Sequence, residues 1–66
     1  MLQLKIQDLA RERGYSIEHL SRETGLGVPT VRRYWNNRVR RVRLPILAAI
    51  SGTLNVEVSE LFKKTE

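Results

Sequence analysis

The stretch from Ser16 to Asn37 constrains the fold more than any other part of the chain. It has the pattern of two short helices separated by a glycine turn. Ser16 is a residue type that caps helix N-termini, because its hydroxyl accepts a hydrogen bond from the first helical turn. Gly25 suits the left-handed conformation that ends one helix and turns the chain. Pro29 falls in the first turn of the next helix, where its missing amide costs no hydrogen bond.

Apolar residues fall at the positions that would hold these two helices together. Leu20, Leu26 and Val31, together with Tyr34, are expected to fix the angle at which the helices cross. Ser21 is small at the point where the helices must approach each other. Each feature alone is weak evidence. Together and in register they favour a helix-turn-helix over about residues 17–36, rather than a helical bundle with this spacing by chance.

The flanking segments predict further helices. Apolar residues at helical spacing predict an amphipathic helix over Gln3–Arg13 and another over Leu44–Leu54. A short last helix is expected from about Glu57, and Lys63 and Lys64 suit its C-terminal end. The basic segment Asn37–Arg43 is expected to be a loop. The sequence therefore predicts an all-α, compact five-helix domain that spans residues 1–66.

Charge is distributed unevenly along the 66 residues, which carry a net charge of +5 at pH 7. Between Glu23 and Glu57 there is no acidic residue. The basic residues in that interval are all arginines, namely Arg32, Arg33, Arg38, Arg40, Arg41 and Arg43. The planar guanidinium group suits phosphates and guanine edges better than the ammonium of lysine does. A polyanion is therefore the expected partner of this region, rather than the face serving only solubility.

Other classes of function find little support in the residues. The chain has no cysteine, which excludes a disulfide framework and a zinc–cysteine site. His19 could pair with Glu23, but two such groups do not form a metal site. The longest apolar run, Leu44–Ile50, is far shorter than the about 20 residues that cross a bilayer. We expect a cytoplasmic protein without a signal peptide, catalytic residues, metal, cofactor or small-molecule ligand.

The chain resembles the Cro/repressor-like (XRE) helix-turn-helix family over nearly its whole length. The residues that carry the likeness are Ile6, Leu9, Gly14, Tyr15 and Ser16 at the start, Leu20, Gly25, Leu26, Thr30 and Val31 in the centre, and Leu47–Ser51, Leu54–Val56 and Glu60–Phe62 at the end. The resemblance implies a lambda-repressor-like domain that binds double-stranded DNA. It further implies a transcriptional regulator of the repressor type, in a prokaryotic or phage setting and associated with the nucleoid.

The resemblance also implies roles for individual residues. Residues 28–36 would be the recognition helix that enters the major groove, with Arg32 and Arg33 pointing outward. Ser16 lies where the family touches phosphate, and the loop that follows the recognition helix lies where the family grips the backbone. With Thr30, which helical spacing places away from the core, the candidate DNA-binding residues are Ser16, Val28, Pro29, Thr30, Arg32, Arg33, Asn36, Arg38, Arg40, Arg41 and Arg43.

The sequence departs from the family in places. Ile17 stands where the family commonly has a glutamine that helps to clamp phosphate. Ala10 and Trp35 are apolar where some members pair an arginine with a glutamate, so packing is expected to replace an ion pair. Ile17 and Thr30–Trp35 also resemble the opening of MerR-like and excisionase-like proteins, which read DNA with a winged domain. The ending, Val56 followed by Glu60–Phe62, favours the Cro/repressor-like family.

The sequence also leaves open hypotheses about self-association and about other classes of function. A homodimer on a two-fold symmetric operator is expected, with Val58 and Phe62 as the self-contact surface. An antitoxin-type module that binds a protein is one rival. An RNA-binding domain is another, but the sequence offers no exposed aromatic platform of the kind that single-stranded RNA readers use.

Overall fold

The computed structural model describes residues 3–63 of the chain. In that part, four α-helices are followed by one 3-10 helix: α1 (Ile6–Glu12), α2 (Ile17–Thr24), α3 (Val28–Trp35), α4 (Leu44–Leu54) and η1 (Val58–Leu61). The all-helical fold is confirmed, but the expectation of five α-helices is wrong, because the closing element is a single 3-10 turn. Lys64, expected at the end of that element, lies outside the described residues.

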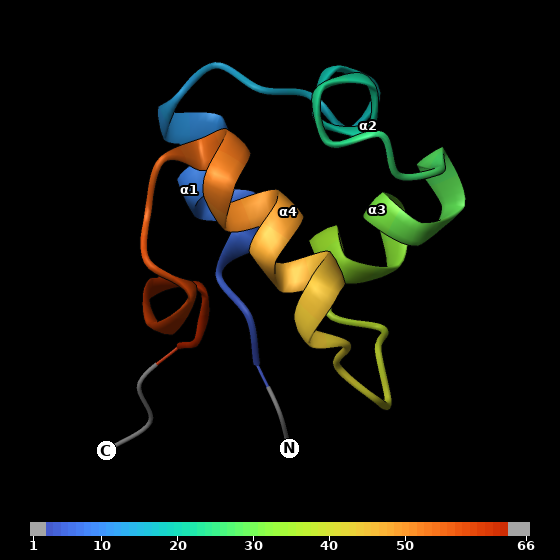
Figure 1. The fold of residues 1–66 in the computed structure, drawn as a ribbon, viewed down its shortest axis with the longest axis vertical. Helices are drawn as coiled ribbons and strands as arrows, with labels where there is room; N and C mark the ends of the chain where they lie inside the picture. The colour runs from blue at the N-terminus through green and yellow to red at the C-terminus, as the bar shows by residue number, and fades with distance from the viewer. Residues whose placement is uncertain (1–2, 64–66) are drawn as a thin grey trace.

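The helices form one small assembly around a shared core (Figure 1). α2 packs against α3 and α4, η1 packs against α4, and α1 packs against α3. The buried apolar side chains come from every element and are Leu4, Ile6, Ala10, Leu20, Val31, Tyr34, Trp35, Leu47, Ile50, Leu54 and Leu61. Ala10 and Trp35 belong to the same core cluster, in agreement with the expectation that packing takes the place of an ion pair.

Residues 3–5 lie outside any helix, so the prediction that a helix begins at Gln3 is wrong. Leu4 forms an isolated antiparallel bridge with Phe62. The Lys5 amide donates a hydrogen bond to the Leu61 carbonyl at 2.8 Å, and the Lys63 amide donates one to the Gln3 carbonyl at 3.0 Å. Pairing between the two ends of the chain thus satisfies backbone groups that a helix would otherwise use, and α1 begins only at Ile6.

Each of the four α-helices is followed by a residue in the left-handed conformation, and three of these ends, those of α1, α3 and α4, share one hydrogen-bond pattern. Gly14 follows α1 with a φ of 76°, and Asn37 and Asn55 follow α3 and α4 with φ values of 58°. At these three ends an amide returns to a carbonyl five residues earlier, for example Arg38 to Arg33 at 2.8 Å. This pairing satisfies carbonyls that the helix leaves free. Asn55 ends α4 as expected, and Leu44–Leu54 has the predicted bounds.

Asn37 has a second role that joins distant parts of the chain. Its side-chain oxygen accepts a hydrogen bond from the Leu4 amide at 2.5 Å, and its side-chain nitrogen donates one to the Leu4 carbonyl at 2.9 Å. The Asn37 side chain therefore pairs with both backbone groups of Leu4, as a neighbouring strand would. This contact ties the N-terminal segment to the end of α3.

We expect Asn37→Gly to lower the free energy of unfolding by about 1–2 kcal/mol more than Asn55→Gly does, measured by urea denaturation. Both replacements keep a residue that adopts the left-handed conformation easily, and both add the same freedom to the unfolded chain. Only the first removes the two bonds to Leu4. Equal losses in the two variants would show that these bonds contribute nothing.

Candidate nucleic-acid interface

The turn between α2 and α3 is held by side-chain hydroxyl groups. The Thr24 hydroxyl donates to the Leu20 carbonyl at 2.7 Å and accepts from the Leu26 amide at 3.3 Å. The hydroxyl of Ser21, which is buried, donates to the Leu26 carbonyl. Gly25 has the expected positive φ of 76°. These bonds fix how α3 leaves α2, so Ser21 contributes a hydrogen bond as well as its small size.

Ser16 caps α2 as predicted. Its hydroxyl accepts a hydrogen bond from the His19 amide at 3.1 Å. The His19 ring lies against Tyr15, with 4.5 Å between the ring centroids. The cap uses an acceptor site of the exposed Ser16 hydroxyl, so its O–H group can still donate a hydrogen bond to a phosphate.

α3 has one buried face and one exposed, basic face. Val31, Tyr34 and Trp35 are the buried residues of this helix. The exposed residues are Pro29, Arg32, Arg33 and, just after the helix, Asn36, whereas Val28 and Thr30 are half-buried. No carboxylate lies on this helix, so nothing on its own surface would repel a phosphate.

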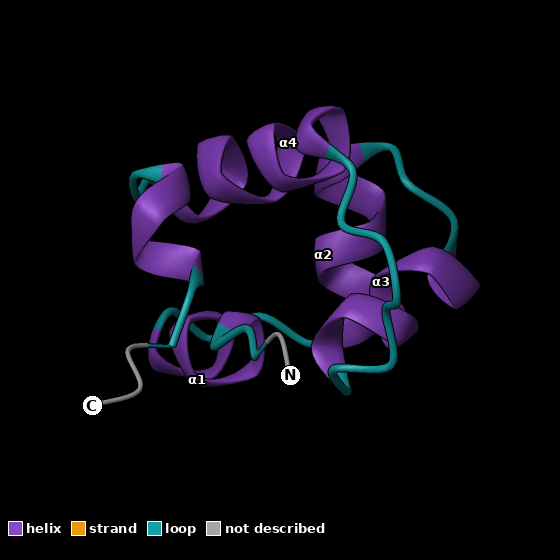
Figure 2. Ribbon diagram, turned by 90° about the horizontal axis from the view of Figure 1, so that it is seen from below, coloured by secondary structure: helices purple, strands orange, loops and turns teal. Residues whose placement is uncertain are grey.

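One loop connects α3 to α4 (Figure 2), and hydrogen bonds anchor it at both ends. At its start, the Arg38 amide donates to the Arg33 carbonyl at 2.8 Å. At its end, the Arg43 amide donates to the hydroxyl of Tyr34 at 3.1 Å. In between, Val39 and Val42 are half-buried and pack against the core. The loop is therefore basic as expected, but it isn't simply solvated, because its valines hold it to the domain.

Two hollows on this side of the molecule bring the candidate residues together. The larger, of about 540 Å³, lies between α3, the loop and the start of α4, and is lined by Thr30, Arg33, Tyr34, Arg38, Val39, Arg40, Arg41, Arg43 and Ile46. The second, of about 360 Å³, is lined by Pro29, Arg32, Arg33, Asn36 and Arg38. Every candidate residue except Ser16 and Val28 lines one of them.

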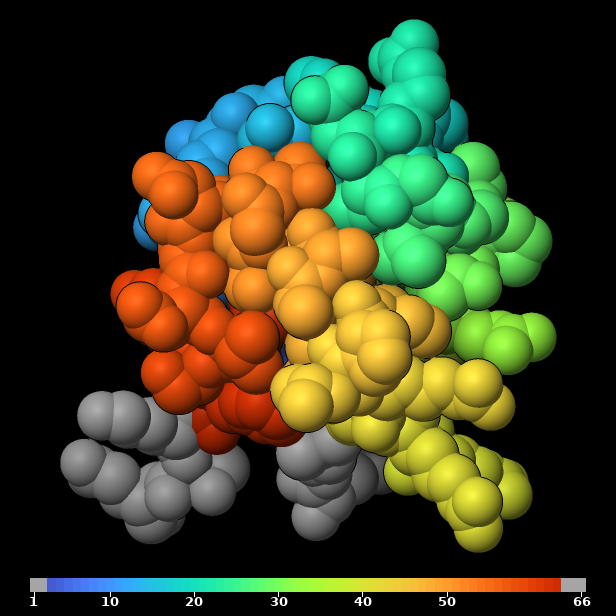
Figure 3. Space-filling model, in the orientation of Figure 1, coloured from blue at the N-terminus to red at the C-terminus, as the bar shows by residue number. Residues whose placement is uncertain are grey.

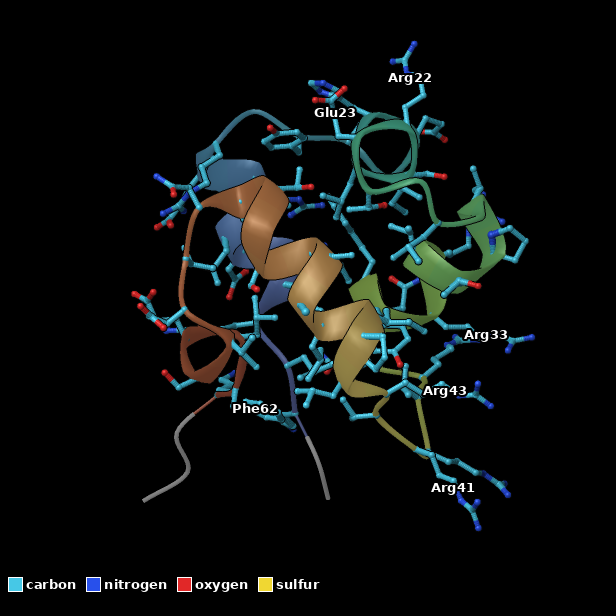
Figure 4. The ribbon with its side chains drawn as sticks, viewed as in Figure 1. Arg22, Glu23, Arg33, Arg41, Arg43 and Phe62 are labelled. Carbon is cyan, nitrogen blue, oxygen red and sulfur yellow. The ribbon has the colours of Figure 1, made fainter. Side chains whose placement is uncertain are left out.

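The arginines of these hollows form one continuous cationic surface. Arg33, Arg41 and Arg43 project from the same side of the molecule, whereas Arg22 and Glu23 project from its top (Figure 4). Among the described residues, an ion pair joins Arg13 and Glu12 at 3.6 Å, and none involves an arginine of the hollows. In the same part of the chain no three side chains of the metal-binding types gather together. No helix there is long and apolar enough to cross a membrane.

Residues 5–65 match the profile of the Cro/C1-type HTH DNA-binding domain. The chain belongs to this family. Its fold is similar to that of a crystal structure from Bacteroides fragilis, a protein proposed to bind DNA, with a TM-score of 0.83 and 22% sequence identity. The likeness covers 96% of this chain and 100% of the other. A search among curated proteins found no match.

Family membership gives the elements their roles. The Cro/C1-type domain is a DNA-binding helix-turn-helix domain, and α2, the Gly25 turn and α3 are the elements that the sequence predicts to form its motif. The winged alternative considered from Ile17 and Thr30–Trp35 has no support, because residues 3–63 contain no strand beyond the single bridge of Leu4 with Phe62.

Sequence reasoning missed the residues that shape the loop of this Cro/C1-type domain. The sequence predicts a basic loop over Asn37–Arg43 and a core position for Tyr34, but it does not predict that Val39 and Val42 pack against the core or that the Tyr34 hydroxyl accepts the Arg43 amide. The available signal is the order Val-Arg-Arg-Val over residues 39–42. Two apolar residues that flank two charged ones indicate a segment whose ends pack and whose middle is exposed.

We expect Tyr34→Phe to keep the fold and to loosen the loop. The ring stays in the core, but the Arg43 amide loses its acceptor, at a cost of about 0.5–1.5 kcal/mol. Hydrogen exchange should show faster exchange of the Arg43 amide, with the Val31 amide inside α3 unchanged as the internal control. Unchanged protection at Arg43 would show that the hydroxyl does not hold the loop.

Proposed function

We propose that this Cro/C1-type domain binds double-stranded DNA in a sequence-specific manner and acts as a transcriptional regulator of the repressor type. α3 enters the major groove, and the loop that follows it lies along the backbone. The observation that carries the proposal is the acid-free arginine surface, which is continuous from the exposed face of α3 to the start of α4. Membership of a DNA-binding family supports it.

In this proposal, the arginines of α3 recognise the bases. Arg33 is exposed and lines both hollows, so it lies at the centre of the cationic surface, with Arg32 beside it. An arginine fork donates two hydrogen bonds to O6 and N7 of guanine, and a good pair discriminates between bases by about 1–3 kcal/mol. Val28 and Pro29 offer no donors. They would meet a thymine methyl group or shape the approach of the helix.

Backbone contacts fall to the residues around the loop. Arg38 and Arg43, at the two anchored ends of the loop, line the larger hollow, and Asn36 lines the smaller one. Contacts of this kind set the register of the protein on the duplex but carry little sequence information. The Ser16 end of α2 would add one further phosphate contact.

A single domain of this size makes few base contacts, so we propose that two copies bind half-sites about one helical turn apart. The sequence suggested Val58 and Phe62 as the self-contact surface. Both are half-buried, and Phe62 is bridged to Leu4, so only part of each side chain is free for a second copy.

One observation favours a second candidate, a module that also binds a protein. Leu44 at the start of α4 is 66% exposed, and Pro45 and Ala48 on the same helix are exposed too. This apolar surface lies at the start of α4, which adjoins the basic loop (Figure 3). Sedimentation of the wild type and of Leu44→Gln would show whether this face joins two copies.

Arg33→Ala should flatten the sequence preference. Selection of bound sequences from a random duplex pool should recover a motif for the wild type. In that motif, the preference for guanine at one position should fall about tenfold or more in the variant. Arg22→Ala is the matched control, because Arg22 is exposed on α2 and projects elsewhere (Figure 4). An equal loss of affinity for all sequences would make Arg33 a phosphate contact instead.

Binding should also depend steeply on salt. If about six phosphates are neutralised, the plot of log affinity against log salt concentration should have a slope near −5. Arg38→Ala should weaken binding to all sequences alike and reduce the slope by about one. A slope near zero would contradict a backbone role for the loop.

A further inference from the structure

We infer that Arg40 and Arg41 form a prong that enters the minor groove beside the major groove occupied by α3, where it favours A·T pairs. The inference rests on the proposed function and adds a second specificity element to it. It separates the arginines of the loop into two kinds. Arg38 and Arg43 lie at the two anchored ends of the loop, and Arg40 and Arg41 lie at its tip.

The shape of the loop makes the tip project. Val39 and Val42 pack against the core on either side of the pair. The chain bends at Arg40 and Arg41, and both side chains are exposed. In Figure 4, Arg41 extends away from the body of the domain, beyond Arg33 and Arg43. In Figure 3 the loop likewise stands out at the lower right. The pair is therefore held outward by its neighbours rather than loosely tethered.

The position of the loop places its tip past the major groove. α3 has 8 residues, so its axis is about 12 Å long, and the loop continues from its C-terminal end. A recognition helix lies in the major groove with its N-terminal residues at the base edges, so the loop that follows it meets what lies beyond the edge of the groove. That is the phosphate backbone and then the minor groove, which is about 6 Å wide. A flat guanidinium group on an extended side chain fits a space of that width.

The chemistry of the pair suits a minor groove better than an open backbone. A guanidinium is more weakly hydrated than an ammonium, so it enters a narrow groove with a smaller loss of hydration. A·T tracts have a narrow minor groove with an enhanced negative potential that attracts inserted arginines. Two adjacent arginines repel each other, and no acidic residue occurs between Glu23 and Glu57 to relieve this. A site of strong negative potential would relieve it.

The test uses duplexes that differ only in the minor groove. Inosine·C pairs present the same groups as G·C pairs in the major groove but lack the amino group in the minor groove. We expect the wild type to bind an inosine·C duplex about tenfold more tightly than a G·C duplex of the same length and order, in a fluorescence anisotropy titration. The double variant Arg40→Lys/Arg41→Lys keeps both charges and should lose this preference. Arg38→Lys is the matched control and should keep it.

The outcomes separate this inference from the proposed function. Equal binding of the two duplexes by the wild type overturns the prong, and so does a lysine double variant that retains the preference. Replacing guanine with 7-deazaguanine removes a major-groove acceptor and tests α3 alone. If 7-deazaguanine weakens binding but the inosine·C and G·C duplexes bind equally, α3 still lies in the major groove and the loop tip contacts phosphate.

Discussion

Tyr34 joins the core of this domain to its charged surface. Its ring is buried among the helices, and its hydroxyl accepts the Arg43 amide at 3.1 Å. Val39 and Val42 add apolar contacts on the same loop. The loop therefore gains its position from a small set of contacts with a small core. If Tyr34 shifts, α3 and the arginine loop move relative to each other, and the larger hollow between them changes shape.

The second constraint is the separation of charge. The exposed face of α3 and the loop carry arginines and no carboxylate, whereas the acidic side chains lie before and after this interval. Like charges held close together disfavour the free domain, and a polyanion removes that penalty when it binds. The same arrangement that weakens the domain alone thus favours the complex, and it explains why the contacts that hold the loop are apolar or made by backbone amides.

Local signals in the sequence predicted much of the fold. The features that were not predicted depend on contacts between residues far apart in the chain. Ser16, Gly25 and Asn55 act at helix ends through their immediate neighbours, so their roles could be predicted. The pairing of Leu4 with Asn37 and Phe62 joins residues far apart in the chain, and no local pattern indicates it. The last helix is a 3-10 turn because it fits only four residues between Glu57 and the bridge at Phe62. The exposed arginines of the candidate site were evident from charge, whereas the anchors beneath them were not.

The most direct test of this account is the set of backbone amide signals that shift when a short duplex is added, recorded by nuclear magnetic resonance. We predict that the largest shifts fall on α3 and on the loop Asn36–Arg43, with smaller ones at the Ser16 end of α2. Signals of α1 and η1 should change little. Shifts centred on the Leu44 face of α4 and on η1, with α3 and the loop unaffected, would contradict the claim that the arginine surface is the DNA interface.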